Sequence, residues 1–244
     1  MALLETHDLT KDFGGLRALD GATFSVEQGS ITALIGPNGA GKTTAFNCIS
    51  GIIKPTSGRV VFDGRDVTGK EPHVVTRRGI ARTFQITREL GELTVLENMV
   101  VQSPTEGLWS MLGRSILARE RRRAMELLVF VGIAKLADEQ AKHLSYGQKK
   151  LLEFASVLMA EPRLIMLDEP GGGVNPALLD TIMTRIRDVN RTGVTFLIVE
   201  HNMDVVMQLS QSVVVMAHGD VLVQDTPDAV QLDDAVLDAY LGKA

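Results

Sequence analysis

A glycine-rich segment at residues 36–44 constrains the fold more than any other feature of this chain. It follows an apolar run typical of a buried strand, residues 31–35, and precedes a helical pattern over residues 45–49. A phosphate-binding loop requires this context, because backbone N–H groups and a helix N-terminus then face an anion. Lys42 adds a positive charge, and Thr43 offers a hydroxyl to Mg²⁺. We therefore predict a site for a nucleoside triphosphate and Mg²⁺ at Gly36, Pro37, Asn38, Gly39, Ala40, Gly41, Lys42, Thr43 and Thr44.

Two further apolar runs end in polar residues that suit hydrolysis. The run 164–167 ends in Asp168 and Glu169, and the run 195–199 is followed, after Glu200, by His201. Strands of an α/β fold bind ligands at their carboxyl ends. We expect Asp168 to hold Mg²⁺ through water and Glu169 to act as the general base. His201 is expected to contact the γ-phosphate and to orient the attacking water. An acidic pair alone is more often a helix cap and a lone histidine more often structural, but a phosphate loop upstream favours catalysis.

The order of patterns predicts an α/β fold built on a P-loop core. Short apolar runs alternate with helical periodicity, as in a largely parallel sheet. The first 30 residues and residues 58–63 alternate in polarity between turn residues, which predicts an antiparallel β subdomain. Helical patterns at 95–101 and 115–131 predict an inserted helical subdomain. We expect a single domain, 1–244, in which residues 1–92 and 158–244 form the nucleotide-binding core and residues 93–157 the helical subdomain.

Composition narrows the classes of partner and compartment. The net charge of −5 argues against a nucleic-acid partner, because a phosphate-binding face normally makes a domain basic. The single cysteine, Cys48, excludes an intrachain disulfide and is expected to be a small buried hydrophobe. The N-terminus has no signal-peptide pattern, and no apolar run approaches the roughly 18 residues of a spanning helix. The basic run 119–123 is expected to be a solvated helix face, with contact to anionic lipid headgroups as the alternative.

A further motif gives the chain its family resemblance. Leu144, Ser145, Tyr146, Gly147 and Gln148 precede the acidic strand by about 20 residues. Together with the phosphate loop, the acidic strand end and His201, this motif closely resembles the signature of ABC ATPases. The resemblance covers nearly the whole chain and implies the ABC ATPase architecture and ATP hydrolysis.

The resemblance also implies roles for residues that spacing alone leaves open. Gln85 matches the glutamine that senses Mg²⁺ and the attacking water and links to the membrane partner. Phe13 matches the aromatic that stacks on adenine, although a core phenylalanine is the alternative. The residues that match the clamp on a γ-phosphate held by the opposite subunit are Ser145, Gly147 and Gln148. One phosphate loop and one signature per chain therefore imply a dimer, of identical or related ATPase chains.

Two departures from the usual pattern point to one branch of the family. Tyr146 replaces a glycine of the signature, and residues 171–176 replace the common loop after Glu169. These variants resemble the ATPases of branched-chain amino acid importers. That branch implies import of branched-chain amino acids or similar small polar solutes, with urea and amides among the alternatives. It also implies transmembrane permease subunits, an indirectly coupled solute-binding protein and a peripheral location at the cytoplasmic face of the inner membrane.

Three other classes of protein share parts of this sequence pattern. An exporter motor, such as a lipopolysaccharide-type system, resembles the chain in its motifs, and a soluble ABC ATPase acting on DNA or ribosomes is a further alternative. A P-loop GTPase is excluded, because no Asn-Lys pair of a guanine-binding motif occurs in the sequence.

Overall fold

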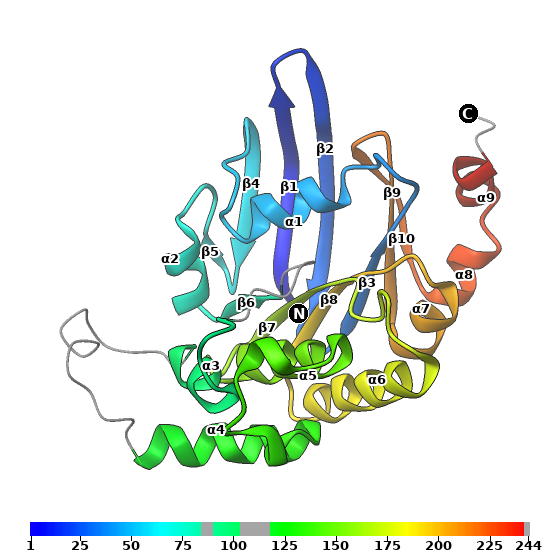
Figure 1. The fold of residues 1–244 in the computed structure, drawn as a ribbon. Helices are drawn as coiled ribbons and strands as arrows, with labels where there is room; N and C mark the ends of the chain where they lie inside the picture. Colours follow the sequence, from blue (N-terminus) through cyan, green and yellow to red (C-terminus); the bar gives the residue numbers. More distant parts are fainter. Residues whose placement is uncertain (84–89, 103–117, 242–244) are drawn as a thin grey trace.

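The structure is a computed structural model that describes residues 1–83, 90–102 and 118–241 (Figure 1). Its larger sheet is mostly parallel and has the strand order β10-β9-β3-β8-β7-β6. Neighbouring strands from β9 to β6 pair in parallel, and β10 pairs antiparallel with β9. The strands are β3 (Ile31–Ile35), β6 (Ile80–Arg82), β7 (Leu164–Asp168), β8 (Thr195–Val199), β9 (Ser212–Ala217) and β10 (Asp220–Asp225).

A smaller antiparallel sheet stands beside it, with the strand order β2-β1-β4-β5. Its first two strands form a hairpin whose turn is Gly14 and Gly15, and Phe13 pairs with Leu16 at the end of the ladder. Gly14 has a φ of 58°, a conformation that glycine adopts without steric cost. The strands are β1 (Ala2–Phe13), β2 (Leu16–Glu27), β4 (Ser57–Phe62) and β5 (Arg65–Asp66).

The helices lie on both sides of the parallel sheet. Figure 1 shows α3 to α6 gathered on the side away from the antiparallel sheet, while α1 packs toward that sheet. The helices are α1 (Lys42–Ile49), α2 (Pro72–Arg77), α3 (Val95–Val101), α4 (Ala118–Val131), α5 (Tyr146–Leu158), α6 (Pro176–Asn190), α7 (Met203–Leu209), α8 (Pro227–Gln231) and α9 (Asp234–Leu241), with 3-10 turns η2 (Ala134–Leu136) and η3 (Ala141–His143).

Strand β7 illustrates how the sequence forms two cores. Leu164 and Met166 point into the cluster that contains α1 and the antiparallel sheet, whereas Ile165 and Leu167 point into the cluster with α3, α5 and α6. This is the period of two that a strand imposes. All four side chains are at most 1% exposed, and full burial of such side chains contributes about 1.5–3 kcal/mol each. Strand β7 is thereby fixed between two layers, which fixes the position of its carboxyl end.

The predicted fold class is confirmed: a P-loop core with a mostly parallel sheet, an antiparallel sheet beside it and a group of helices between α3 and α5. The division into residues 93–157 and the remainder stays a prediction; helix α5 runs through the position of the second boundary. Of the predicted helix 115–131, the described part begins at Ala118. Among the described helices, none has the length and apolarity needed to cross a membrane.

Candidate functional site

A cavity of about 400 Å³ lies where β3 meets α1, beside the carboxyl ends of β7 and β8. Its walls bring together the phosphate loop and the acidic strand end, which are more than a hundred residues apart in the sequence. Both features lie at the same sheet edge because β3, β8 and β7 are parallel neighbours. The lining residues are Leu16, Arg17, Ala18, Asn38, Gly39, Ala40, Gly41, Lys42, Thr43, Thr44, Asp168, Glu169 and Val199.

Two glycines fix the shape of the loop that enters this cavity. Gly36 has a φ of 146°, and a Cβ there would lie 2.1 Å from the Met216 carbonyl oxygen. At Gly41, whose φ is 100°, a Cβ would lie 2.6 Å from the Ala18 carbonyl oxygen. Only glycine allows both the backbone conformation and this close approach. The loop is therefore held against β9 and β2, and the first residues of α1 line the cavity.

Lys42 begins α1 and provides the positive charge of the cavity. Its Nζ donates to the carbonyl oxygens of Gly36, at 2.7 Å, and Pro37, at 2.9 Å. Burial lowers the pKa of Lys42, and the nearby charges of Glu169 and Asp168 partly oppose that shift. The ammonium group thus lies between the loop and the two carboxylates, where the terminal phosphates of a nucleotide are expected.

Asp168 is held by a buried arginine that the sequence analysis did not select as a site residue. Arg82 Nη2 donates to Asp168 Oδ2 at 3.1 Å, and the two side chains are 9% and 4% exposed. Arg82 also donates from Nη1 to Asn47 Oδ1 at 2.6 Å and to Ser50 Oγ at 3.2 Å, both near the end of α1. Burial lowers the pKa of Arg82, which Asp168 partly counteracts. The arginine therefore ties β6, α1 and the predicted Mg²⁺ ligand together.

Glu169 and His201 lie next to each other at the ends of β7 and β8. The Glu169 N–H donates to the Val199 carbonyl at 2.9 Å, which fixes the backbone of the carboxylate at the sheet edge. Its Oε1 lies 3.6 Å from His201 Nδ1, and the His201 side chain is 68% exposed. Glu169 also has a φ of 47°, in the left-handed region that few non-glycine residues adopt. Such local strain is common at functional sites.

Glu200, immediately before His201, is a buried carboxylate that links the two strand ends. It is 2% exposed, and its Oε1 accepts from Gly171 N–H at 3.3 Å. Its Oε2 accepts from His201 N–H at 3.2 Å and from Asn202 N–H at 3.5 Å. Burial raises the pKa of Glu200, and these backbone donors partly lower it. Glutamate before His201 was visible in the sequence, but nothing there indicated that it would be buried between two loops.

The donors in the cavity suit Mg²⁺. Thr43 and Asp168 offer a hydroxyl and a carboxylate, and Glu169 lies beside them. Hard oxygen ligands, few from protein and the rest from water and phosphate, are what Mg²⁺ prefers. Within the described residues no cluster of three or more His, Cys, Asp or Glu side chains forms a metal site. The residues therefore fit a cation that is held partly by the nucleotide rather than by the protein alone.

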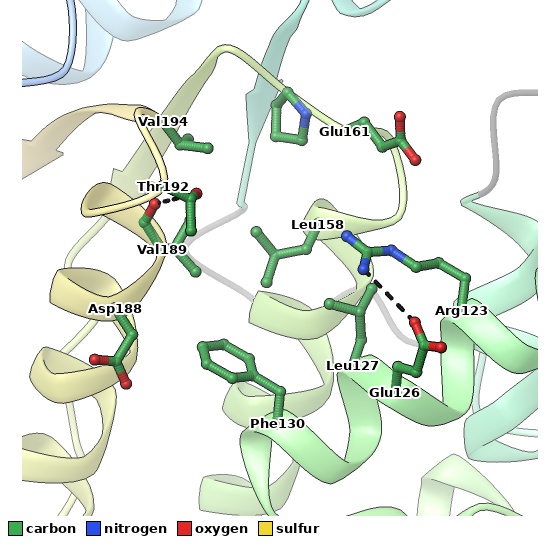
Figure 2. Close-up of a pocket in the computed structure, with 11 residues that line it drawn as sticks. Arg123, Glu126, Leu127, Phe130, Leu158, Glu161, Asp188, Val189, Thr192 and Val194 are labelled. Carbon is green, nitrogen blue, oxygen red and sulfur yellow. Dashed lines mark hydrogen bonds and ion pairs between the residues drawn. The ribbon is translucent and has the colours of Figure 1, made fainter.

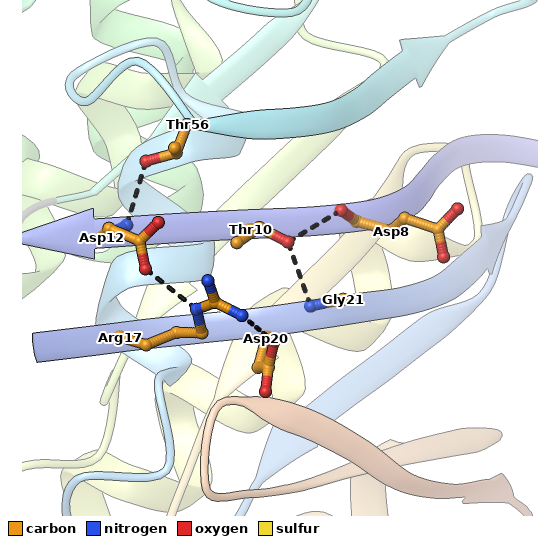
Figure 3. A network of polar contacts seen from close by, with 7 residues as sticks. All are labelled: Asp8, Thr10, Asp12, Arg17, Asp20, Gly21 and Thr56. Carbon is orange, nitrogen blue, oxygen red and sulfur yellow. Dashed lines mark hydrogen bonds and ion pairs between the residues drawn. The ribbon is translucent and has the colours of Figure 1, made fainter.

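Phe13 and Arg17 flank the cavity on the hairpin of the antiparallel sheet. Phe13 is 45% exposed, with Lys11 Nζ 5.0 Å from its ring, and it is not among the lining residues. Arg17, which the sequence analysis did not single out, does line the cavity. Figure 3 shows its guanidinium between Asp12 and Asp20. Nε donates to Asp12 Oδ1 and Nη1 donates to Asp20 Oδ1, both at 2.9 Å. These hydrogen bonds raise the pKa of Arg17, and the bond to Asp12 has the largest effect. They also restrain the position of the guanidinium.

The signature residues begin α5 and lie outside the cavity. The Gln148 N–H donates to Ser145 Oγ at 3.3 Å, while the Ser145 N–H donates to Gln148 Oε1 at 2.8 Å. This is a capping box, which satisfies the first N–H groups of the helix. Gly147 lies against α6, where a Cβ would be 2.4 Å from Leu178 Cδ2. None of the three predicted signature contacts lines the chain's own phosphate cavity.

Gln85, the remaining predicted site residue, lies outside the described residues. Its proposed role in sensing Mg²⁺ and the attacking water stays a prediction. Thr83, two residues earlier, is described and buried, and its Oγ1 lies 3.5 Å from the Asp168 N–H. The segment that leads to Gln85 therefore starts at the acidic strand end.

A second cavity, of about 440 Å³, lies between α4, the end of α5 and the end of α6 (Figure 2). Leu127, Phe130, Leu158 and Val189 give it apolar walls. It lies near the amino ends of β7 and β8, at the edge of the sheet opposite the phosphate loop. No sequence-predicted site residue lines it.

Comparison with known proteins gives close relatives over the whole chain. Residues 19–172 match the ABC transporter family. The chain is 41% identical over 247 residues to a probable branched-chain amino acid transport ATP-binding protein, LivG, of Archaeoglobus fulgidus, covering 99% of this chain and 96% of that protein. It is 39% identical to the high-affinity branched-chain amino acid transport ATP-binding protein BraF of Pseudomonas aeruginosa, covering 99% and 98%.

Solved structures give the same result for the fold. The ADP conformation of an ATP-binding cassette of an ABC transporter superposes with a TM-score of 0.89 and 37% identity, covering 99% of each chain. A nucleotide-free ATP-binding cassette from an ABC transporter gives a TM-score of 0.88 at 36% identity, covering 98% of this chain and 99% of that one. The shared fold thus extends over both sheets and the helices between them.

Proposed function

The chain belongs to the ABC transporter family, and from this premise we propose that it is the ATP-hydrolysing motor subunit of an importer for branched-chain amino acids. It is an ATPase that binds ATP and ADP. One observation carries the proposal: a single cavity gathers the phosphate loop with Lys42, the hydroxyl of Thr43 and the carboxylates of Asp168 and Glu169. These are the groups that phosphoryl transfer to water requires.

In the proposed reaction the loop N–H groups and Lys42 hold the β- and γ-phosphates of ATP. Glu169 accepts a proton from the attacking water. The water oxygen forms a bond to the γ-phosphorus, and the bond between the γ-phosphorus and the oxygen that bridges to the β-phosphate breaks. His201, whose Nδ1 lies 3.6 Å from Glu169 Oε1, is proposed to contact the γ-phosphate and to orient the attacking water. General base catalysis of this kind contributes about 10² to 10⁴ in rate.

Thr43 and Asp168 are the residues proposed to hold Mg²⁺ here, with Gln85 as a further ligand. When bound, the cation neutralises charge on the phosphate oxygens. Arg82 is proposed to position Asp168, because the ion pair between the two side chains restrains the carboxylate. The Asp168 side chain is therefore positioned before a nucleotide arrives.

Hydrolysis is proposed to need two ATPase chains. Ser145, Gly147 and Gln148 stand at a helix N-terminus, which attracts an anion, yet they do not line the chain's own cavity. Their proposed ligand is the γ-phosphate held by a second ATPase chain. Two chains then close around two nucleotides and reopen after hydrolysis. ATP favours the closed state of the two chains because it binds that state more tightly than the open one.

The transport direction and solute are proposed from the relatives. Proteins named as branched-chain amino acid transport ATP-binding proteins are 37–41% identical to this chain over nearly its full length. This favours an importer over an exporter motor or a non-transport ATPase. The proposed partners are transmembrane permease subunits and, indirectly, a solute-binding protein. The proposed location is peripheral, at the cytoplasmic face of the cell membrane.

The test is uptake of radiolabelled leucine by vesicles that contain this chain together with the permease subunits and the solute-binding protein proposed as its partners. Wild type is compared with Lys42→Met, and with Lys135→Met as a control at an exposed lysine outside the cavity. ATP-driven uptake by wild type and the control, and its loss in Lys42→Met, supports the proposal. ATP hydrolysis that leucine neither stimulates nor couples to uptake would refute the assignment to amino-acid import.

A further inference from the structure

The two departures from the usual family pattern touch each other. Tyr146 Oη, at the start of α5, donates to the Gly172 carbonyl oxygen at 3.0 Å. Gly172 lies in the loop that follows Glu169, within the unusual segment 171–176. Tyr146, which replaces a glycine of the signature, thus contacts the other unusual segment.

The contact extends beyond this hydrogen bond. A Cβ on Gly173, which has a φ of 72°, would lie 3.3 Å from Tyr146 Cε1, so the ring packs directly over that glycine. Lys150 Nζ also lies over the ring, 5.8 Å from its centroid, within the range of a cation–π interaction. Tyr146 is therefore fixed in one orientation although 49% of it is exposed.

The loop that Tyr146 contacts is hydrogen-bonded to the backbone of Glu169, the proposed base. The Gly172 N–H donates to the Glu169 carbonyl oxygen at 2.9 Å, while the Gly172 carbonyl accepts from Tyr146. One residue therefore connects the signature turn with the backbone of Glu169. At its other end the loop leads into α6, whose Leu178 packs against Gly147 of the signature.

We propose that Tyr146 is a positioning residue that couples the signature of a chain to the catalytic Glu169 of the same chain. The inference rests on the proposed function, in which the signature clamps the nucleotide held by a second ATPase chain. When the signature binds that nucleotide and shifts, Tyr146 shifts with it. The hydrogen bonds of Gly172 then pass this movement to the backbone of Glu169. Each cavity thereby responds to the nucleotide in the other.

The first experiment tests the contact in the single chain. Amide hydrogen exchange of the peptide covering residues 170–175 is compared for wild type and Tyr146→Phe, without nucleotide. A hydrogen bond contributes about 0.5–1.5 kcal/mol, so we expect exchange about two- to tenfold faster in the variant. Thr184→Val, which loses an exposed hydroxyl-to-carbonyl bond of 2.8 Å in α6, is the control. Unchanged exchange in Tyr146→Phe would overturn the proposal.

The second experiment tests which cavity Tyr146 serves. Differently tagged copies are purified as a mixed dimer in which one chain carries Glu169→Gln, so that one cavity hydrolyses ATP. Tyr146→Phe is placed either in the chain with intact Glu169 or in its neighbour. We expect a two- to tenfold fall in kcat, with the KM for ATP unchanged, only for the first placement.

The other outcomes are equally informative. A loss only for the second placement would mean that Tyr146 acts on the nucleotide across the interface, and a loss for both or neither would also overturn the proposal. If wild-type copies neither associate with ATP nor hydrolyse it, the proposed function fails instead. The exchange measurement on the single chain still tests the contact in that event.

Discussion

Removing the Glu200 carboxylate should loosen both catalytic strand ends. In Glu200→Ala the N–H groups of Gly171 and His201 lose their acceptor inside the protein. An unsatisfied buried donor costs about 1–3 kcal/mol, so two cost about 2–6 kcal/mol. Relief of a buried charge offsets part of this, because burial raises the pKa of Glu200. We expect a loss of about 2–3 kcal/mol in the free energy of unfolding, and about 1 kcal/mol for Glu200→Gln, which keeps one acceptor oxygen.

The pH dependence separates this account from simple loss of packing. A carboxyl group whose folded pKa is raised binds its proton more tightly in the folded state, so its contribution to stability falls as pH rises above the ordinary value of 4.5. Glu200→Gln does not titrate at this position. Urea unfolding of both proteins across acid to neutral pH should therefore show wild type losing its advantage over Glu200→Gln as pH rises. An advantage that grows with pH would refute the reasoning.

Three further predictions concern individual positions. Gly36→Ala should abolish nucleotide binding measured by titration calorimetry, because its Cβ would lie 2.1 Å from the Met216 carbonyl; binding at wild-type affinity would contradict this. Gly147→Ala should destabilise the chain in urea by about 1 kcal/mol, because its Cβ would lie 2.4 Å from Leu178 Cδ2 and that side chain must rotate away. The cost of Gly147→Ala should fall when Leu178 is also replaced by Ala; the same cost with and without Leu178→Ala would refute the contact. Cys48, whose pKa burial raises to about 11, should resist alkylation near pH 8 until the chain is unfolded, as mass spectrometry would show.

Much of the fold followed from local patterns because its central strands are buried on both faces. The runs 31–35 and 195–199 coincide with β3 and β8, and the run 164–167 gave β7 except for its last residue, Asp168. A buried parallel strand is nearly continuous in apolar residues, which makes it visible without knowledge of its neighbours. The phosphate loop was equally visible, because its glycines and lysine are consecutive in the sequence.

The supporting residues were not visible, because their partners are distant in the sequence. Arg82 stands on β6, a strand of three residues, and binds Asp168, 86 positions away. Glu200 reaches Gly171 across 29 positions, and Tyr146 reaches Gly172 across 26. Pairings of this kind depend on the order of strands in the sheet and on how α5 packs beside α6. Local patterns in the sequence do not reveal either of these features.

The central claim is that Glu169 activates water at a cavity that holds ATP. Its most direct test is the rate of ATP hydrolysis by Glu169→Gln beside wild type, with ATP binding measured on the same preparations. We expect the variant to bind ATP as well as wild type does but to hydrolyse it more slowly by about 10² or more. Hydrolysis by Glu169→Gln at the wild-type rate would contradict the role of Glu169 as the general base.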